Sequence, residues 1–138
     1  MSSLKAGDVM SSPVVACLPT ASAREVGIYL LGNQYHGLPV VDNDGTVIGI
    51  VTENDLNRAV AEGLNLAEVA VSQLMTETVM TADWSDDLDS VVLQLQTMHV
   101  KQIPITRNKK IVGIITEKDI LRANIKPGFI TFGRPTHQ

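Results

Sequence analysis

The sequence has few of the residues that mark several large protein classes. It has one cysteine, Cys17, so it lacks both the pair needed for an intramolecular disulfide and the thiolate pairs of a zinc site. It has 11 lysines and arginines against 15 aspartates and glutamates, a net charge of −4 that gives no basic footprint for nucleic acid or acidic membranes. No apolar run is long enough to cross a bilayer, and the first residues lack the apolar core of a signal peptide. We therefore expect a cytoplasmic protein that binds neither nucleic acid nor a membrane.

Signs of catalysis are equally sparse. The three histidines, His36, His99 and His137, lack metal-ligand spacing, and the sequence has no Gly-x-Ser-x-Gly or Walker-type loop. Cys17 has no evident partner base. We therefore expect no catalytic residues, no metal site, no required cofactor and no enzymatic activity.

What the sequence does contain is an internal repeat. The segment GIVTEND at residues 49–55 returns sixty-four residues later as GIITEKD at residues 113–119. Upstream, an offset of sixty-five aligns apolar residues and prolines through the rest of the unit, which indicates two copies of one supersecondary structure. We divide the chain into a first repeat with its lead-in at 1–63, a second repeat with its connector at 64–125, and a C-terminal tail at 126–138.

The hydrophobic pattern predicts a β-α-β-β-α order for the first repeat. Its elements are expected to be a strand at 13–17, a helix from Thr20 or Ser22 to about Gln34, strands at 38–41 and 46–51 around an Asn/Asp/Gly turn, and a helix from Thr52 to Gly63. Its inward-facing helical residues are expected to be Val26, Leu30 and Leu31, followed by Leu56, Ala59 and Val60.

The second repeat is predicted to have the same order. Its elements are expected to be strands at 78–81, 103–105 and 111–115, a helix from Ser85 or Asp86 to about His99, and a helix from Glu117. One such unit, with a three-stranded sheet and two helices, is too small to bury its apolar face well. We therefore predict an α+β (α/β) fold in which two units pack together about a pseudo-twofold axis.

The repeated Gly-x-x-Thr-x-x-Asp segment has two interpretations. In the first, the threonine is a helix N-cap and the aspartate completes a capping box, although aspartate is expected to reach the N-cap amide less well than glutamate. In the second, Gly49 and Gly113 let a ligand approach the backbone closely. The aspartate carboxylate is also suited to accept two hydroxyls of a ribose.

The doubled unit carries a family resemblance. With LPVV at 38–41, IPIT at 103–106 and Gly-x-x-Thr-x-x-Asp after each third strand, it resembles a tandem pair of CBS domains, or Bateman module, in a stand-alone CBS domain protein. The resemblance covers nearly the whole chain outside the tail. In that family this segment is the adenosine-binding signature. The resemblance implies a regulatory module that binds an adenine nucleotide (AMP, ADP or ATP) or an adenosyl compound of the S-adenosylmethionine or NAD type between its repeats, and signals to a partner by a conformational shift.

The resemblance also implies which residues contact the ligand. The two aspartates would take the ribose hydroxyls, and the two threonines would face the ribose or the α-phosphate. In this family each site mixes the two copies. One site is therefore expected to combine Thr116 and Asp119 with Ala16, Tyr35, His36 and Gly37, and the other to combine Thr52 and Asp55 with Thr81, Val100, Lys101 and Gln102.

The residues before each second-strand proline bear on the kind of ligand. They supply one cation per copy, His36 and Lys101, and no arginine fork. A monophosphate or diphosphate nucleotide, or an adenosyl compound with an uncharged tail, is therefore easier to accommodate than a triphosphate. His36 and Lys101 are as readily explained as surface residues as by a contact with phosphate.

A second interpretation of the whole chain is a ligand-independent dimerisation or protein-interaction module. There the threonine and aspartate signatures only cap helices, and exposed apolar helix faces drive association. Both interpretations predict a homodimer, a disc of four CBS units, and both leave room for an unidentified effector protein. The tail at 126–138, which holds both phenylalanines, is either frayed or docked on a neighbouring subunit.

Overall fold

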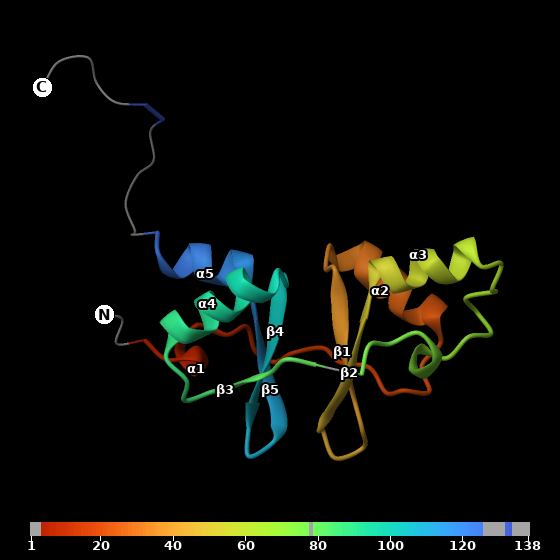
Figure 1. Cartoon of the computed structure of the whole chain (residues 1–138), viewed down its shortest axis with the longest axis horizontal. Helices are drawn as coiled ribbons and strands as arrows, with labels where there is room; N and C mark the ends of the chain where they lie inside the picture. The colour runs from red at the N-terminus through yellow and green to blue at the C-terminus, as the bar shows by residue number, and fades with distance from the viewer. Residues whose placement is uncertain (1–3, 78, 126–131, 134–138) are drawn as a thin grey trace, which may run out of the picture.

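The strands of the two repeats lie in the centre of the molecule, with their helices on the outer sides (Figure 1). The computed structural model describes residues 4–77, 79–125 and 132–133. They form two sheets, one with the order β1-β2 and one with the order β3-β4-β5. The α+β fold with two repeated units is confirmed.

The first repeat contains two helices and an antiparallel hairpin. Ser22 caps its first helix with a complete capping box to Glu25, as the Ser-x-x-Glu pattern favours. Its elements are α2 (Ala23–Asn33), β1 (Gly37–Val41), β2 (Val47–Thr52) and α3 (Glu53–Ala61), preceded by the short lead-in helix α1 (Ala6–Val9).

The second repeat has the same elements and one additional short strand. Its helix begins after Asp87 rather than at Ser85 or Asp86, because those two residues form a turn in which their backbone or side chains bond to Asp83. Its elements are β3 (Ala82–Asp83), α4 (Leu88–Met98), β4 (Gln102–Arg107), β5 (Lys110–Thr116) and α5 (Glu117–Ala123), preceded by the 3-10 turn η1 (Val71–Gln73).

The predicted first strand of each repeat is mostly wrong, and the prolines explain why. Cys17 forms only an isolated parallel bridge to Val40, with Cys17 N–H donating to Pro39 O at 3.0 Å. A parallel ladder would continue upstream through an N–H of Pro39, which proline lacks. It would continue downstream through an N–H of Pro19, which is also missing. The first sheet therefore has two strands.

The second repeat has a proline at the position equivalent to Pro39 but none at the position equivalent to Pro19. Pro104 occupies the position of Pro39, and the expected strand at 78–81 does not form in the described residues. Trp84 occupies the position of Pro19, and its N–H donates to Thr106 O at 2.8 Å. This bond lets β3 pair with β4 over Ala82 and Asp83, so the second sheet gains a third strand.

The lead-in and the connector each pack on the opposite repeat. In the lead-in, Gly7 N–H donates to Trp84 O at 2.8 Å, and Ser11 forms an antiparallel bridge with Ile114 of β5. In the connector, Thr76 forms the equivalent bridge with Ile50 of β2. These two crossing segments, residues 10–12 and 75–77, tie the repeats together at positions that the repeat makes equivalent.

Each repeat has its own hydrophobic core, and two predicted core residues lie outside it. The first core includes Val26, Leu30 and Leu56, and the second is built from the corresponding side of α4 and the β4-β5 hairpin. Full burial of such side chains contributes about 1.5–3 kcal/mol each. Leu31 is instead 80 % exposed and Val60 is 56 % exposed, because each lies on the outer side of its helix.

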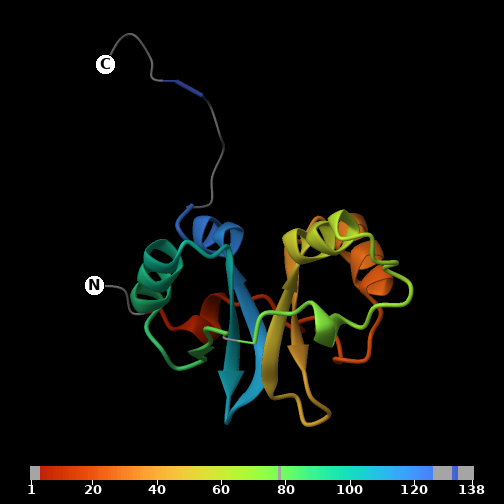
Figure 2. The same ribbon diagram turned by 45° about the vertical axis from the view of Figure 1, so that its right-hand side comes forward.

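The hairpins also meet across the two repeats. Ile111 N–H donates to Gly45 O at 2.9 Å, which joins β5 to the turn of the first hairpin. Figure 2 shows both hairpin tips at the end of the molecule away from α3 and α5. The predicted behaviour of the tail lies outside the described residues, apart from Phe132 and Gly133.

Candidate ligand-binding clefts

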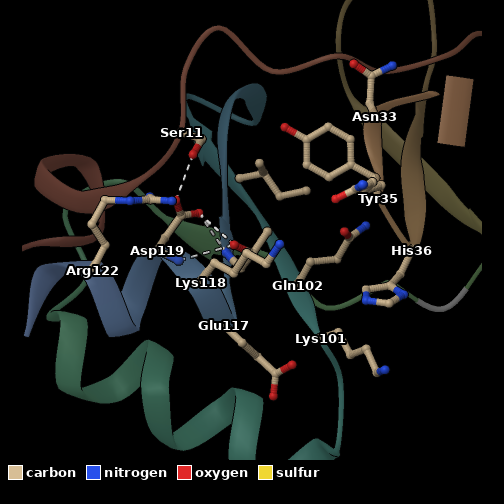
Figure 3. A pocket seen from close by; sticks show the side chains of 13 residues that line it. Ser11, Asn33, Tyr35, His36, Lys101, Gln102, Glu117, Lys118, Asp119 and Arg122 are labelled. Carbon is tan, nitrogen blue, oxygen red and sulfur yellow. Dashed lines mark hydrogen bonds and ion pairs between the residues drawn. The ribbon is translucent and has the colours of Figure 1, made fainter. Parts of the chain in front are cut away.

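Two clefts open between the repeats, one beside each Gly-x-x-Thr-x-x-Asp segment. The Asp119 cleft, of about 280 Å³, is lined by Thr116 and Asp119 of the second repeat and by Tyr35 and His36 of the first (Figure 3). The Thr52 cleft, of about 530 Å³, is lined by Thr52 and Glu53 of the first repeat and by Val100 and Gln102 of the second. Each cleft therefore mixes the two repeats.

The Asp119 cleft is built around the N-terminus of α5. Thr116 is the N-cap, and its Oγ1 accepts from Asp119 N–H at 3.3 Å. In return, Asp119 Oδ2 accepts from Thr116 N–H at 2.9 Å and from its hydroxyl at 3.1 Å. The capping interpretation is therefore confirmed. Aspartate was expected to reach the N-cap amide less well than glutamate, but its distance equals the 2.9 Å of Glu25 to Ser22 N–H in α2.

The outer oxygen of Asp119 carries two further contacts. Asp119 Oδ1 accepts from the Ser11 hydroxyl at 2.8 Å and from Arg122 Nη1 at 3.1 Å. The carboxylate is 4 % exposed and fully engaged. A hydroxyl entering the cleft can bond to Oδ1 only by sharing it with, or displacing, Ser11 or Arg122.

The first repeat has the same cap but lacks a contact equivalent to the one from the Ser11 hydroxyl to Asp119. Asp55 Oδ2 accepts from Thr52 N–H at 2.8 Å, and its Oδ1 accepts from Arg58 Nη2 at 2.8 Å. Among the described residues no hydroxyl of the crossing segment bonds to Asp55 as Ser11 does to Asp119. Asp55 is also not among the residues that line the Thr52 cleft. The two clefts are thus not chemically equivalent.

Gly49 and Gly113, at equivalent positions of the two repeats, leave room for the crossing segments to pack on β2 and β5. A Cβ at Gly113 would lie 2.8 Å from Met10 Cγ and 3.0 Å from Ser11 O. A Cβ at Gly49 would lie 2.6 Å from Met75 Sδ. The expectation that these glycines admit a ligand is wrong, because a methionine of the protein itself occupies the space beside each one.

The wall opposite Asp119 is aromatic. Tyr35 stacks on Tyr29 with ring centroids 6.0 Å apart and an interplanar angle of 13°. Both rings line an adjoining cavity of about 110 Å³, together with Val14 and Gly37. Burial, and to a smaller extent the neighbouring Tyr35, raise the pKa of Tyr29. An apolar, planar group fits this cavity.

His36 and Lys101 line both clefts. His36 Nδ1 lies 3.2 Å from Glu53 Oε1, and its carbonyl accepts from Glu53 N–H at 2.9 Å. The Lys101 carbonyl accepts in the same way from Glu117 N–H at 3.4 Å. The backbone of His36 and the backbone of Lys101 are therefore each fixed to the helix of their own repeat. Their exposed side chains reach the space between the repeats.

Gln102 carries a buried donor in the same wall. Its side chain lines both clefts, and its Nε2 finds no hydrogen-bond acceptor within the described residues. Leaving a buried donor unpaired costs about 1–3 kcal/mol. A ligand acceptor that met this amide would recover that cost.

The structure brings most of the predicted residues to the two clefts. Ala16, Asp55 and Thr81 are not among the lining residues of the cavities described above. Ser11, Lys118 and Arg122 line the Asp119 cleft and were not predicted. The spacing of Asp119 and Arg122, three residues apart on one helix, could have indicated Arg122. Ser11 had no local signal, because it reaches the cleft from the other repeat.

Two further observations concern the described residues as a whole. No three histidine, cysteine, aspartate or glutamate side chains in this part of the chain are grouped so that they could hold a metal ion. Within the same residues, no helix combines the length and the apolar character that a membrane span requires.

The family follows from both the sequence and this architecture. Residues 6–62 and 71–126 each match the family model of the CBS domain. The two matches cover most of the 138 residues, so the protein belongs to the CBS domain family as a tandem pair.

One known relative is a much longer protein than this chain. The chain is 28 % identical over 116 residues to the L-aspartate semialdehyde sulfurtransferase of Methanocaldococcus jannaschii, and the match covers 83 % of this chain and 22 % of that enzyme. This chain thus spans about a fifth of the length of that relative.

Solved structures with the same fold contain adenosyl compounds. The CBS domain pair of protein MJ0100, in complex with 5′-methylthioadenosine and S-adenosylmethionine, superposes with a TM-score of 0.76 at 27 % identity, over 86 % of this chain and 94 % of that one. CBSX2 in complex with AMP has a TM-score of 0.76 at 23 % identity, over 87 % and 95 % of the two chains, and shares the fold.

Proposed function

We propose that this protein is a regulatory module that binds an adenine nucleotide or another adenosyl compound, with the Asp119 cleft as its principal site. One observation carries the proposal: the buried, hydrogen-bonded Asp119 and the N-cap Thr116 of one repeat face Tyr35 of the other across a single cleft. The adenosyl compounds bound to the CBS pair of protein MJ0100 support the choice of ligand class.

The lining of the cleft suggests an orientation for the ligand. The adenine lies against Tyr35 in the adjoining cavity, where stacking on an aromatic ring is favourable. The ribose lies at Asp119, where a hydroxyl replaces Ser11 or Arg122 on Oδ1. Figure 3 shows Lys101 and His36 away from the Tyr35 ring, at the end where a 5′ substituent would emerge.

The charges at that end favour a small anionic group. Lys101, Lys118 and the titratable His36 line it, and Glu117 opposes them. Arg122 is already paired with Asp119. One or two phosphates can be neutralised by these groups, whereas a triphosphate would bring more charge than the free cations match. AMP and ADP are thus preferred to ATP.

Ligand binding would bias the arrangement of the two repeats. Adenine and ribose contacts come from different repeats, so the ligand favours the arrangement in which both sets are made. The lead-in couples the Asp119 cleft to the second sheet, since Ser11 bonds to both Asp119 and Ile114 of β5. A partner protein that binds one arrangement more tightly than the other would therefore respond to the ligand.

A homodimer is the second part of the proposal. Apolar side chains remain exposed on the outer helices, among them Leu31 of α2, Leu93 of α4 and Leu121 of α5, at 80 %, 67 % and 62 %. Burying such residues between two copies is favourable by roughly 25 cal/mol per Å². These faces equally fit the alternative function, a ligand-independent interaction module, and binding assays separate the two.

The test is a ligand titration with a matched pair of variants. Thermal shift with AMP, ADP, ATP, S-adenosylmethionine and NAD finds the ligand, because a ligand at a hundredfold over its Kd stabilises the fold by about 2.7 kcal/mol. Asp119→Asn should weaken the tighter binding step by roughly 10- to 100-fold, the loss of one charge-assisted hydrogen bond.

Asp55→Asn is the control for that variant. Asp55 makes the same cap contacts, so its substitution reproduces the loss of the cap without the loss of the Ser11 contact, and Asp55 does not line the Asp119 cleft. The tighter step should therefore be unchanged in Asp55→Asn. If no compound raises the melting temperature, or if the two variants affect the tighter step equally, the proposed site is wrong.

A further inference from the structure

The two clefts share part of one wall. His36 and Lys101 line both of them, and they occupy equivalent positions of the two repeats, sixty-five residues apart. The backbone of each is bonded to the first residue of α3 or α5, which fixes the start of the side chain between the clefts. The same two basic side chains therefore face both sites.

The clefts differ in what else they offer an anion. The Asp119 cleft has Lys118, and the position equivalent to Lys118 in the Thr52 cleft is Asn54. Among its described lining residues, the Thr52 cleft has Lys101, His36 and His99 as basic groups, and Glu53 already lies against His36. A phosphate in the Thr52 cleft thus depends on Lys101 more heavily than a phosphate in the Asp119 cleft does.

We infer that the two clefts compete for the shared basic side chains of His36 and Lys101, so that a phosphorylated nucleotide in one cleft weakens the binding of a second nucleotide in the other. Uncharged adenosyl compounds escape the competition, because they carry no phosphate for the shared basic side chains, and Gln102, which also lines both clefts, is neutral. The inference rests on the proposed function and adds to it a sensitivity to the charge of the ligand.

The physical reason is electrostatic. The first phosphate neutralises Lys101 and brings a negative charge beside the empty cleft. A second phosphate then meets fewer free cations and a like charge, in a region where fixed protein groups screen less well than bulk water. We expect the second molecule of AMP to bind at least about tenfold more weakly than the first, beyond any difference seen with adenosine.

The test compares AMP with adenosine in two variants by isothermal titration calorimetry. Lys118→Asn gives the Asp119 cleft the residue that the Thr52 cleft has at this position, so it removes the lysine difference between the clefts. In this variant the ratio of the two AMP dissociation constants should still exceed the adenosine ratio by about tenfold. Adding Lys101→Met should lower the AMP ratio to within about threefold of the adenosine ratio, and the remaining difference is the direct repulsion between the two phosphates.

Each outcome bears on a different statement. If AMP and adenosine show the same ratio in Lys118→Asn, the clefts do not compete, and the inference is overturned while the proposed function stands. Persistence of the full AMP effect after Lys101→Met also overturns it, because the shared lysine is then not responsible. If neither AMP nor adenosine binds to the unsubstituted protein, the inference is overturned, and the proposed function fails as well if ADP, ATP, S-adenosylmethionine and NAD also do not bind.

Discussion

Replacing Gly113 by alanine tests the assignment of this glycine to the crossing segment. The added Cβ would lie 2.8 Å from Met10 Cγ and 3.0 Å from Ser11 O. The methionine can rotate away, but the carbonyl is held because it accepts from Ile114 N–H at 3.1 Å and its own residue donates to Ile114 O at 2.8 Å. Gly113→Ala should therefore destabilise the fold by about 1–3 kcal/mol, the usual cost of overpacking.

The measurement is urea unfolding followed by the fluorescence of Trp84, the only tryptophan in the sequence. Met10→Ala in the same chain should recover about 1 kcal/mol of the loss, since it removes the side-chain part of the clash but not the carbonyl part. Gly32→Ala is the matched control. Nothing lies within 4 Å of a Cβ at Gly32 in α2, so that change should stabilise the fold by about 0.5–1 kcal/mol.

Three results would refute this reasoning. If Gly113→Ala unfolds at the same urea concentration as the unsubstituted protein, Met10 and Ser11 are not packed on the glycine as described. If the variant keeps its stability but loses affinity for AMP, the glycine serves a ligand after all. An additive effect of Gly113→Ala and Met10→Ala would show that the two residues do not interact.

Two further predictions concern Cys17 and the outer helices. Burial raises the pKa of the Cys17 thiol to about 11, so at pH 8 it should react with Ellman's reagent on the order of a hundredfold more slowly than in urea. Because the folded state favours the neutral thiol, the free energy of unfolding should fall as the pH rises from about 9 to about 11. Cys17→Ser should reduce that fall and leave the part that comes from Tyr29, whose pKa is also raised. If the proposed homodimer forms through α2, Leu31→Glu should shift sedimentation from dimer to monomer with less than about 0.5 kcal/mol lost by the monomer. Leu18→Glu, at an exposed apolar residue outside the helices, should leave the proposed dimer intact. A Leu31→Glu protein that sediments like the unsubstituted one would exclude α2 from the interface.

Much of the fold was predictable because its signals are local. Ser22 and Glu25 form a capping box three residues apart, and the Asn/Asp/Gly turn of the first hairpin needs Gly45 at a φ of 86°. The threonine caps of α3 and α5 were likewise visible in the sequence. Each of these features depends on residues within a few positions of one another.

The errors arose where an interaction partner lies far along the chain. Leu31 and Val60 continue apolar patterns, but the side of a helix that faces the core is set by the sheet it packs on, and both residues ended outside. The strand at 13–17 failed because of missing N–H groups on Pro19 and on Pro39, which belongs to another element. Sequence periodicity does not report such pairings.

The sequence by itself determined the two repeats, their capped helices and hairpins, and the family, because these depend on residue type and short spacing. The tertiary structure decided which residues share a cleft. Ser11 bonds to Asp119 across more than a hundred residues of chain, and no comparable hydroxyl reaches Asp55 among the described residues. The near-identical segments GIVTEND and GIITEKD therefore have different surroundings, because the crossing segments and opposite repeats that complete them differ in sequence.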